Sequence, residues 1–383
     1  MKVIRSTNVL IDNKFVCADI VIEKNIISSI KPYKTYENAI DFGDKRIVPG
    51  FVDLHSDAIE KEIEPRPGAR FPIEIAIVEL DKKLSMAGIT TMYHAVGFND
   101  EELRKGRGTE QSKELIEKIY ESNKKHLGVD NLIHARFEIT SLTSVLVIKQ
   151  LIKEKKINML SFMDHSPGQG QFKTLELWKK YHLSAYDINE QEIEEYLVNK
   201  ISKKNNEINN VIEDLANFAL SYDIPLLSHD DDSVEKIYML KNLGVTISEF
   251  PLSVEVAKKA KELGIFIGMG APNVVRKGSQ SGNIAARELI KEKVCDYLCS
   301  DYHPSSMLLS PYILKEDIGL EIEKGFAMIS IVPAKISGCN DRGEIKEGLL
   351  ADIVIIDESY FPKVVLTFKN GKVVYNGIRG FEI

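Results

Sequence analysis

The sequence predicts an α/β fold, a (β/α)8 TIM-type barrel with a small β-sandwich domain built from both termini. Two observations favour this architecture. Strand-like and helix-like segments alternate through residues 49–340, whereas residues 1–48 and 341–383 alternate apolar and polar side chains with the period of two that is typical of strands. Because the ends of a domain often lie close together, the two β-rich ends can form one unit beside a central barrel.

Short strand candidates occupy the two ends of the chain. They are VIRSTNVLI, FVCADIVIE and NIISSIKPY near the beginning and ADIVIID, KVVLTFKN and GKVVYNG near the end. Asn370-Gly371 separates the last two, and this dipeptide favours a two-residue hairpin because both residue types tolerate a positive φ. We therefore expect the tail to return as a β-hairpin.

Eight strand candidates occur in the central region, with helical stretches between them, which is the number that a (β/α)8 barrel needs. They are GFVDLHS, ITTMYHAV, LIHARFEI, INMLSFMDH, IPLLSHDD, VTISEFP, IFIGMGAPN and DYLCSDYHP. A doubly wound sheet shows the same alternation, so periodicity alone leaves that architecture open. The connection over residues 166–222 is longer than usual, and we expect a helical insertion there.

Composition excludes some classes of partner. The chain has 383 residues and a formal net charge of −7, whereas broad binding to nucleic acid or to anionic membranes needs a basic surface. A few arginines in a pocket could still bind an anionic small molecule. No run of about 18 apolar residues is present, and four scattered cysteines fit a reducing compartment, so we expect a cytoplasmic protein.

Metal-capable side chains follow five of the predicted barrel strands, at the carboxyl ends where barrel active sites lie. These strand ends are His55-Ser56-Asp57, Glu138, Asp164-His165, His229-Asp230-Asp231-Asp232 and Ser300-Asp301-Tyr302-His303. His55 and Asp57 are two residues apart, so on a strand both would point to one face. Imidazole and carboxylate ligands suit Zn²⁺, Fe²⁺ or Mn²⁺. Any one of these motifs could be a helix cap or a polar strand end, but their agreement predicts a metal site.

Two loops have the composition of an anion-binding site. Arg66 and Arg70 lie in EPRPGAR, where two prolines stiffen the chain. The second loop, GAPNVVRKGSQSGN, offers backbone N–H groups, a cation and small polar side chains before a helix, which together can hold a phosphate. Its candidate substrate-binding residues are Asn273, Arg276, Ser279 and Ser281. The alternative is an exposed flexible loop with an incidental basic pair.

Several motifs resemble a known family. VPGFVDLH resembles the first-strand signature of the amidohydrolase superfamily, and GEI with EGLLADIV resembles its returning β-domain. Within that superfamily the chain resembles the diphosphatase family of the carbon–phosphorus lyase pathway. The matching segments are HSDAIEKEIEPRPG, SFMDHSPGQGQF, LLSHDDDS, SEFPLSVEVA, MGAPNVVRKGSQSGNIAA and LCSDYHPSSML.

This resemblance implies that the protein hydrolyses the triphosphate arm of α-D-ribose 1-methylphosphonate 5-triphosphate to the 5-phosphate and pyrophosphate, in phosphonate catabolism. It implies a divalent metal cofactor, two ions of Zn, or of Mn or Fe. The metal ligands it implies are His55, Asp57, Glu138, His165, His229 and Asp301. Asp301 would also take the proton of the attacking water, and Asp230 and Asp231 would orient His229 or bind the sugar.

Two residues depart from the family pattern. Gln280 stands where a histidine is expected, and Gly170 replaces an expected basic residue, so both changes remove possible contacts to the substrate phosphates. Two other functions stay open: hydrolysis of a C–N bond, as in a deacetylase or deaminase, and a non-catalytic scaffold on the same fold. A homodimer is compatible with either.

Overall fold

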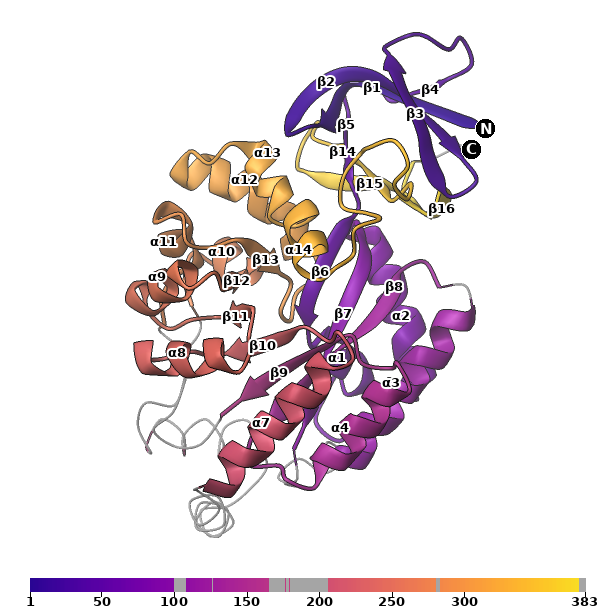
Figure 1. Ribbon diagram of the computed structural model, residues 1–383. Helices are drawn as coiled ribbons and strands as arrows, with labels where there is room; N and C mark the ends of the chain where they lie inside the picture. Colours follow the sequence, from indigo (N-terminus) through magenta and orange to yellow (C-terminus); the bar gives the residue numbers. More distant parts are fainter. Residues whose placement is uncertain are drawn as a thin grey trace.

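A computed structural model defines the fold of the protein. It describes residues 1–99, 108–125, 127–164, 176, 179, 206–279 and 283–378. Two sheets form its framework, an eight-stranded parallel barrel and a sheet built from both ends of the chain (Figure 1). Within the described ranges, no helix is both long and apolar enough to cross a membrane.

The barrel confirms the predicted fold, because each of the eight predicted segments overlaps one of its parallel strands. The strands are β6 (Phe51–Ser56), β7 (Ile89–Phe98), β8 (Asp130–Glu138), β9 (Met159–Met163), β10 (Leu226–His229), β11 (Ile247–Glu249), β12 (Phe266–Gly270) and β13 (Tyr297–Cys299). They are paired in chain order, which excludes the doubly wound alternative, where the order reverses at a switch point.

Helices surround the barrel and bury one face each against it (Figure 1). They are α1 (Ala58–Ile63), α2 (Ile73–Met86), α3 (Thr109–Ser122) with the 3-10 turn η1 (Asn123–Lys125), α4 (Ser144–Lys153), α7 (Asn206–Leu220), α8 (Val234–Asn242), α9 (Val254–Glu262), α10 (Ala271–Val275), α11 (Ala286–Lys291), α12 (Ser306–Ile318), α13 (Ile322–Ala327) and α14 (Ile331–Ile336). Most of the predicted insertion at 166–222 lies outside the described residues, and α7 is its described part.

The barrel closes where β13 meets β6. Ser56 and Asp301 form an isolated parallel bridge, and the Asp301 N–H donates to the His55 carbonyl at 2.9 Å. The side chain of Asp53 adds to this seam, because its Oδ1 accepts from the Ser300 N–H at 2.9 Å. Residues from the first and the eighth barrel strands are thereby held next to each other at the carboxyl end of the barrel.

The second sheet joins the two ends of the chain. Its strands are β1 (Lys2–Ile11), β2 (Lys14–Glu23), β3 (Ile26–Pro32), β4 (Ile40–Asp41), β5 (Arg46–Pro49), β14 (Ile353–Asp357), β15 (Lys363–Lys369) and β16 (Lys372–Asn376). The antiparallel pairing of β5 with β14 connects the N-terminal strands to the C-terminal ones. Asn370 and Gly371 form the predicted hairpin between β15 and β16, with φ values of 51° and 72°. Positive φ at both central residues is the signature of a type I′ turn.

A glycine inside the barrel wall makes room for a buried tyrosine. Gly268 on β12 is paired with Tyr297 on β13, and a Cβ atom at Gly268 would lie 2.3 Å from Cζ of that ring. We expect Gly268→Ala to lower the free energy of unfolding by about 1–3 kcal/mol through overpacking, measured by urea denaturation. Gly97→Ala is the matched control, since the nearest described atom to its Cβ, Asn99 Nδ2, lies at 3.6 Å. Equal stability of the two variants would contradict the expectation.

Candidate metal centre

A bulge in the first barrel strand positions His55. Asp53 on β6 is paired with Met92 on β7, and Ser56 is paired with His94, so β6 has one more residue than β7 in this interval. A bulge re-aims the side chains of its strand. The ring of His55 points into the barrel as a result, where its centroid lies within 5.4 Å of the aromatic rings of His134, His229 and Phe250.

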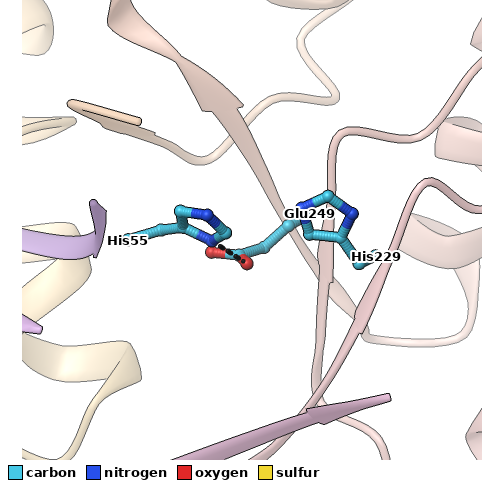
Figure 2. Close-up of side chains that lie close together, drawn as sticks. All are labelled: His55, His229 and Glu249. Atoms are coloured by element: carbon cyan, nitrogen blue, oxygen red, sulfur yellow. Dashed lines mark hydrogen bonds and ion pairs between the residues drawn. The ribbon is translucent and has the colours of Figure 1, made fainter. Parts of the chain in front are cut away.

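Three side chains from three strands meet at the centre of the barrel mouth. One donor atom each of His55 (β6), His229 (β10) and Glu249 (β11) lies within 4.8 Å of the other two, as expected of ligands to one ion (Figure 2). His55 and His229 are predicted ligands, but Glu249 is not among the predicted site residues. Two sequence signals could have pointed to it: its place near the end of the sixth strand candidate and its place in the segment SEFPLSVEVA. Parallel pairing sets Glu249 beside His229 and so brings it into the site.

Glu249 is fully buried and ionised. Burial opposes its ionisation, but electrostatic interactions with His55, His134 and His229 and a hydrogen bond from His55 lower the pKa of Glu249 to about 2. Its Oε2 lies 2.7 Å from Nδ1 of His55, and its Oε1 accepts from the Tyr297 hydroxyl at 2.9 Å. Both carboxylate oxygens therefore already have partners, which fits a residue that orients His55 better than one that binds a cation directly.

Each of the two site histidines has Nδ1 beside a carboxylate. His55 Nδ1 faces Glu249, and His229 Nδ1 lies 3.0 Å from Oδ2 of Asp230. An ionised carboxylate accepts a hydrogen bond from the Nδ1–H, which keeps the proton on Nδ1 and leaves the Nε2 lone pair for a metal. Asp230 is thus beside the His229 ring, and its role in orienting His229 or binding the sugar stays a prediction.

Asp57 and Asp301 lie beside His55 but outside the group of three. Asp57 is the residue before α1 and lies past the end of β6, so the predicted alternation on one strand does not apply to it. Its Oδ1 is buried and finds no hydrogen-bond partner within the described ranges. Burial and the nearby Asp57 carboxylate raise the pKa of Asp301 to about 6, against the opposing charges of His55 and Arg136. The buried Oδ1 of Asp57, which has no hydrogen-bond partner within the described ranges, fits a bound cation.

Arg136 is a cation inside the barrel mouth that the sequence analysis did not single out. It follows His134 by two residues on β8, and its Nε donates to Sδ of Met163 at 3.1 Å. Its positive charge lowers the pKa of Asp57, although burial raises that pKa overall. The guanidinium therefore favours the ionised form of the carboxylates that a metal would need.

The remaining predicted ligands are Glu138 and His165. Glu138 ends β8, is 3% exposed and accepts from the Thr140 hydroxyl at 3.4 Å, but it is not part of the group of three. His165 lies outside the described residues, as do Gly170, Gln280 and Ser281.

Two of the predicted site residues, Asp231 and Asn273, form hydrogen bonds within the protein itself. Asp231 is fully buried, accepts from the hydroxyls of Ser228 and Ser248 and pairs with Lys236 at 3.0 Å. It thereby joins β10 to β11 beneath the site. The amide of Asn273 accepts from the Ala286 N–H at 2.9 Å and so braces its own loop.

The predicted anion-binding residues lie around the rim. Arg66 and Arg70 are exposed on the loop between α1 and α2, and a hydrogen bond between Arg66 O and Ala69 N closes its turn. Arg276 is exposed directly after α10 and donates to the Tyr302 hydroxyl at 3.1 Å. Ser279 is half-buried in the same loop.

Buried His94 couples stability to pH. Burial lowers the pKa of His94 to about 4, below the value of about 6.5 in an unfolded chain, while a hydrogen bond to Asn131 opposes the shift. Between these values the unfolded chain binds a proton that the folded chain does not, so stability falls as the pH drops from 6.5 towards 4. Between pH 7 and pH 5, we expect the free energy of unfolding of the wild-type protein to fall by about 2 kcal/mol more than that of His94→Gln, measured by urea denaturation. An identical loss in both proteins would refute this assignment.

Comparison with known proteins gives matches of sequence and of fold. The model described as amidohydrolase family matches residues 255–375. Over 358 residues the chain is 29% identical to the alpha-D-ribose 1-methylphosphonate 5-triphosphate diphosphatase of Escherichia coli (strain K12), and the match covers 92% of this chain and 94% of that protein.

Solved structures share the fold at low identity. The N-acetyl-D-glucosamine-6-phosphate deacetylase of Mycobacterium smegmatis is 11% identical with a TM-score of 0.67, covering 98% of this chain and 100% of that one. The 5-methylcytosine deaminase of Klebsiella pneumoniae is 14% identical with a TM-score of 0.67, covering 100% of this chain and 99% of that one. At such identities the likeness shows the fold alone.

Proposed function

We propose that this chain is a metal-dependent diphosphatase of the amidohydrolase superfamily, which cleaves the triphosphate arm of α-D-ribose 1-methylphosphonate 5-triphosphate to the 5-phosphate and pyrophosphate. The observation that carries the proposal is the buried cluster of His55, His229 and Glu249 with Asp301 beside it. The match to a diphosphatase along nearly the whole chain supports the choice of substrate.

The donor set fits a divalent cation. We propose His55, His229, Asp57 and Asp301 as ligands, with Glu138 and His165 completing a site for two ions of zinc, manganese or iron. The bound metal would supply positive charge that activates water and offsets the charge of phosphoryl oxygens. Glu249 and Asp230 would hold His55 and His229 in the orientation that presents Nε2.

Asp301 is the proposed catalytic base. Its carboxylate lies beside His55 and Asp57, and burial raises its pKa to about 6. It would accept a proton from the attacking water and pass it to the leaving group. Arg66, Arg70 and Arg276, with Ser279, Ser281 and Asn273, are the proposed contacts to the phosphates. Their charges would stabilise the negative charge that develops on the transferred phosphoryl group.

The test is product analysis with the purified protein. We expect release of pyrophosphate and the 5-phosphate from the ribose methylphosphonate triphosphate, loss of that activity after chelation, and recovery with Zn²⁺ or Mn²⁺. Release of ammonia or a carboxylate from amide or purine substrates, without pyrophosphate, would instead favour the C–N hydrolase. Absence of recruited metal would refute the enzyme proposal. The proposal includes a homodimer, which size-exclusion chromatography with light scattering would test, and a cytoplasmic location, which fractionation of cells would test.

A further inference from the structure

Tyr302 brings together two cations from separate loops. The Lys61 ammonium lies 4.6 Å from the centroid of the Tyr302 ring, and Nη1 of Arg276 donates to the Tyr302 hydroxyl at 3.1 Å. Lys61 belongs to α1 after the first barrel strand, Arg276 follows α10 after the seventh, and Tyr302 follows the eighth. Three carboxyl-end loops thus converge on one aromatic side chain.

Neither cation is part of an ion pair within the described ranges. The basic residues next to them differ in this respect, because Lys277 and Arg287 pair with Asp317 at 3.2 Å and 2.6 Å. The negative charge near Lys61 is that of Asp57, whose pKa it lowers against the larger effect of burial. Bringing two cations together on a neutral ring costs electrostatic energy, which an anion bound between them would recover.

The position of Tyr302 is tied to the metal centre. Asp301 has a φ of 55°, a left-handed conformation that turns the chain sharply before Tyr302. The Asp301 N–H donates to the His55 carbonyl at 2.9 Å, and the Asp57 N–H donates to the Asp301 carbonyl at 2.8 Å. The backbone that carries the tyrosine therefore cannot move without moving the proposed ligands.

We propose that Tyr302 is a positioning residue that holds Lys61 and Arg276 as a clamp for two adjacent phosphoryl groups of a polyphosphate, next to the metal centre. The inference rests on the proposed function for the identity of this anion, the outer part of the triphosphate arm. The ring holds the lysine by a cation–π contact and the hydroxyl holds the arginine by a hydrogen bond, so the two cations stay at a fixed separation.

Two substitutions at Tyr302 separate the two contacts. Tyr302→Phe keeps the ring beside Lys61 and removes the hydrogen bond to Arg276, and Tyr302→Leu removes both. Isothermal titration calorimetry should show that Tyr302→Phe binds sodium pyrophosphate about 3- to 10-fold more weakly than wild type. Tyr302→Leu should bind it about 10- to 100-fold more weakly. Affinity for orthophosphate, which spans one phosphoryl position, should change less than about 3-fold in both.

Kinetics give a second readout that a purely structural role would not move. KM for the triphosphate should rise from wild type to Tyr302→Phe and again to Tyr302→Leu, while kcat of both variants stays within about 3-fold of wild type. Lys277→Met is the matched control, because it removes a cation of the same loop that is already paired with Asp317. It should bind pyrophosphate like wild type. If Tyr302→Leu does not fold, Tyr302→Phe and Lys61→Met carry the test.

The binding measurement does not depend on turnover, so the two proposals can fail separately. Weaker pyrophosphate binding in the Tyr302 variants without triphosphate hydrolysis in wild type would uphold the clamp and reject the proposed reaction. Wild-type pyrophosphate affinity in Tyr302→Phe, Tyr302→Leu and Lys61→Met would overturn the clamp whatever the enzyme hydrolyses. Equal weakening for orthophosphate and pyrophosphate would also overturn it, since that would indicate a general loss of positive charge.

Discussion

Asp301→Asn is expected to lower kcat for pyrophosphate release by about 100- to 10,000-fold while leaving the fold intact. The amide cannot accept the proton of the attacking water, and it brings no negative charge to a cation. The backbone at this position has a φ of 55°, and asparagine is one of the residues that adopt this conformation readily. A loss of activity can therefore be attributed to the carboxylate instead of to backbone strain.

A matched control exists for this substitution. Asp223 is exposed, has a φ of 57° and lies away from the barrel mouth, so Asp223→Asn makes the same chemical change in the same backbone conformation. We expect it to keep wild-type kcat. The assay should be run at saturating metal, with metal content measured in each protein, so that weaker metal binding is not mistaken for loss of the base. Full turnover by Asp301→Asn would refute the role proposed for Asp301.

Glu249→Gln is expected to weaken metal binding by about 10- to 100-fold, measured by competition with a chromophoric chelator. An amide can still accept a hydrogen bond from Nδ1 of His55, but it lacks the charge that stabilises this tautomer and makes Nε2 a better ligand. Tyr297→Phe should weaken metal binding less, because Glu249 keeps its charge and loses one donor. Glu262→Gln, at an exposed position on α9, is the control and should bind metal normally.

The pair of variants also distinguishes an orienting role from direct ligation by Glu249. If Glu249 binds the cation, Tyr297→Phe should leave metal affinity unchanged or raise it, since it frees the Oε1 atom. If Glu249 orients His55, both variants should weaken metal binding, Glu249→Gln more than Tyr297→Phe. Wild-type metal affinity in Glu249→Gln would exclude both roles.

Local patterns in the chain were sufficient for much of the architecture. Each predicted barrel strand overlaps an observed one because buried strands are short apolar runs bounded by polar turns, which is a property of neighbouring residues. The hairpin at Asn370 and Gly371 was predictable for the same reason, since its backbone conformation depends on those two residue types. Strand ends in a barrel converge wherever they lie in the sequence. The proximity of His55, His229 and Asp301 could therefore be predicted from the sequence.

Only the tertiary structure decided which side chains complete the site. Glu249, Arg136 and Tyr302 are not among the predicted site residues, and they reach the barrel mouth through strand pairing and loop packing between residues far apart in the chain. Pairing across the first two barrel strands also produced the bulge that directs His55 inward. Register and bulges depend on which residues of two distant strands meet, and a single sequence read along its length does not contain that information.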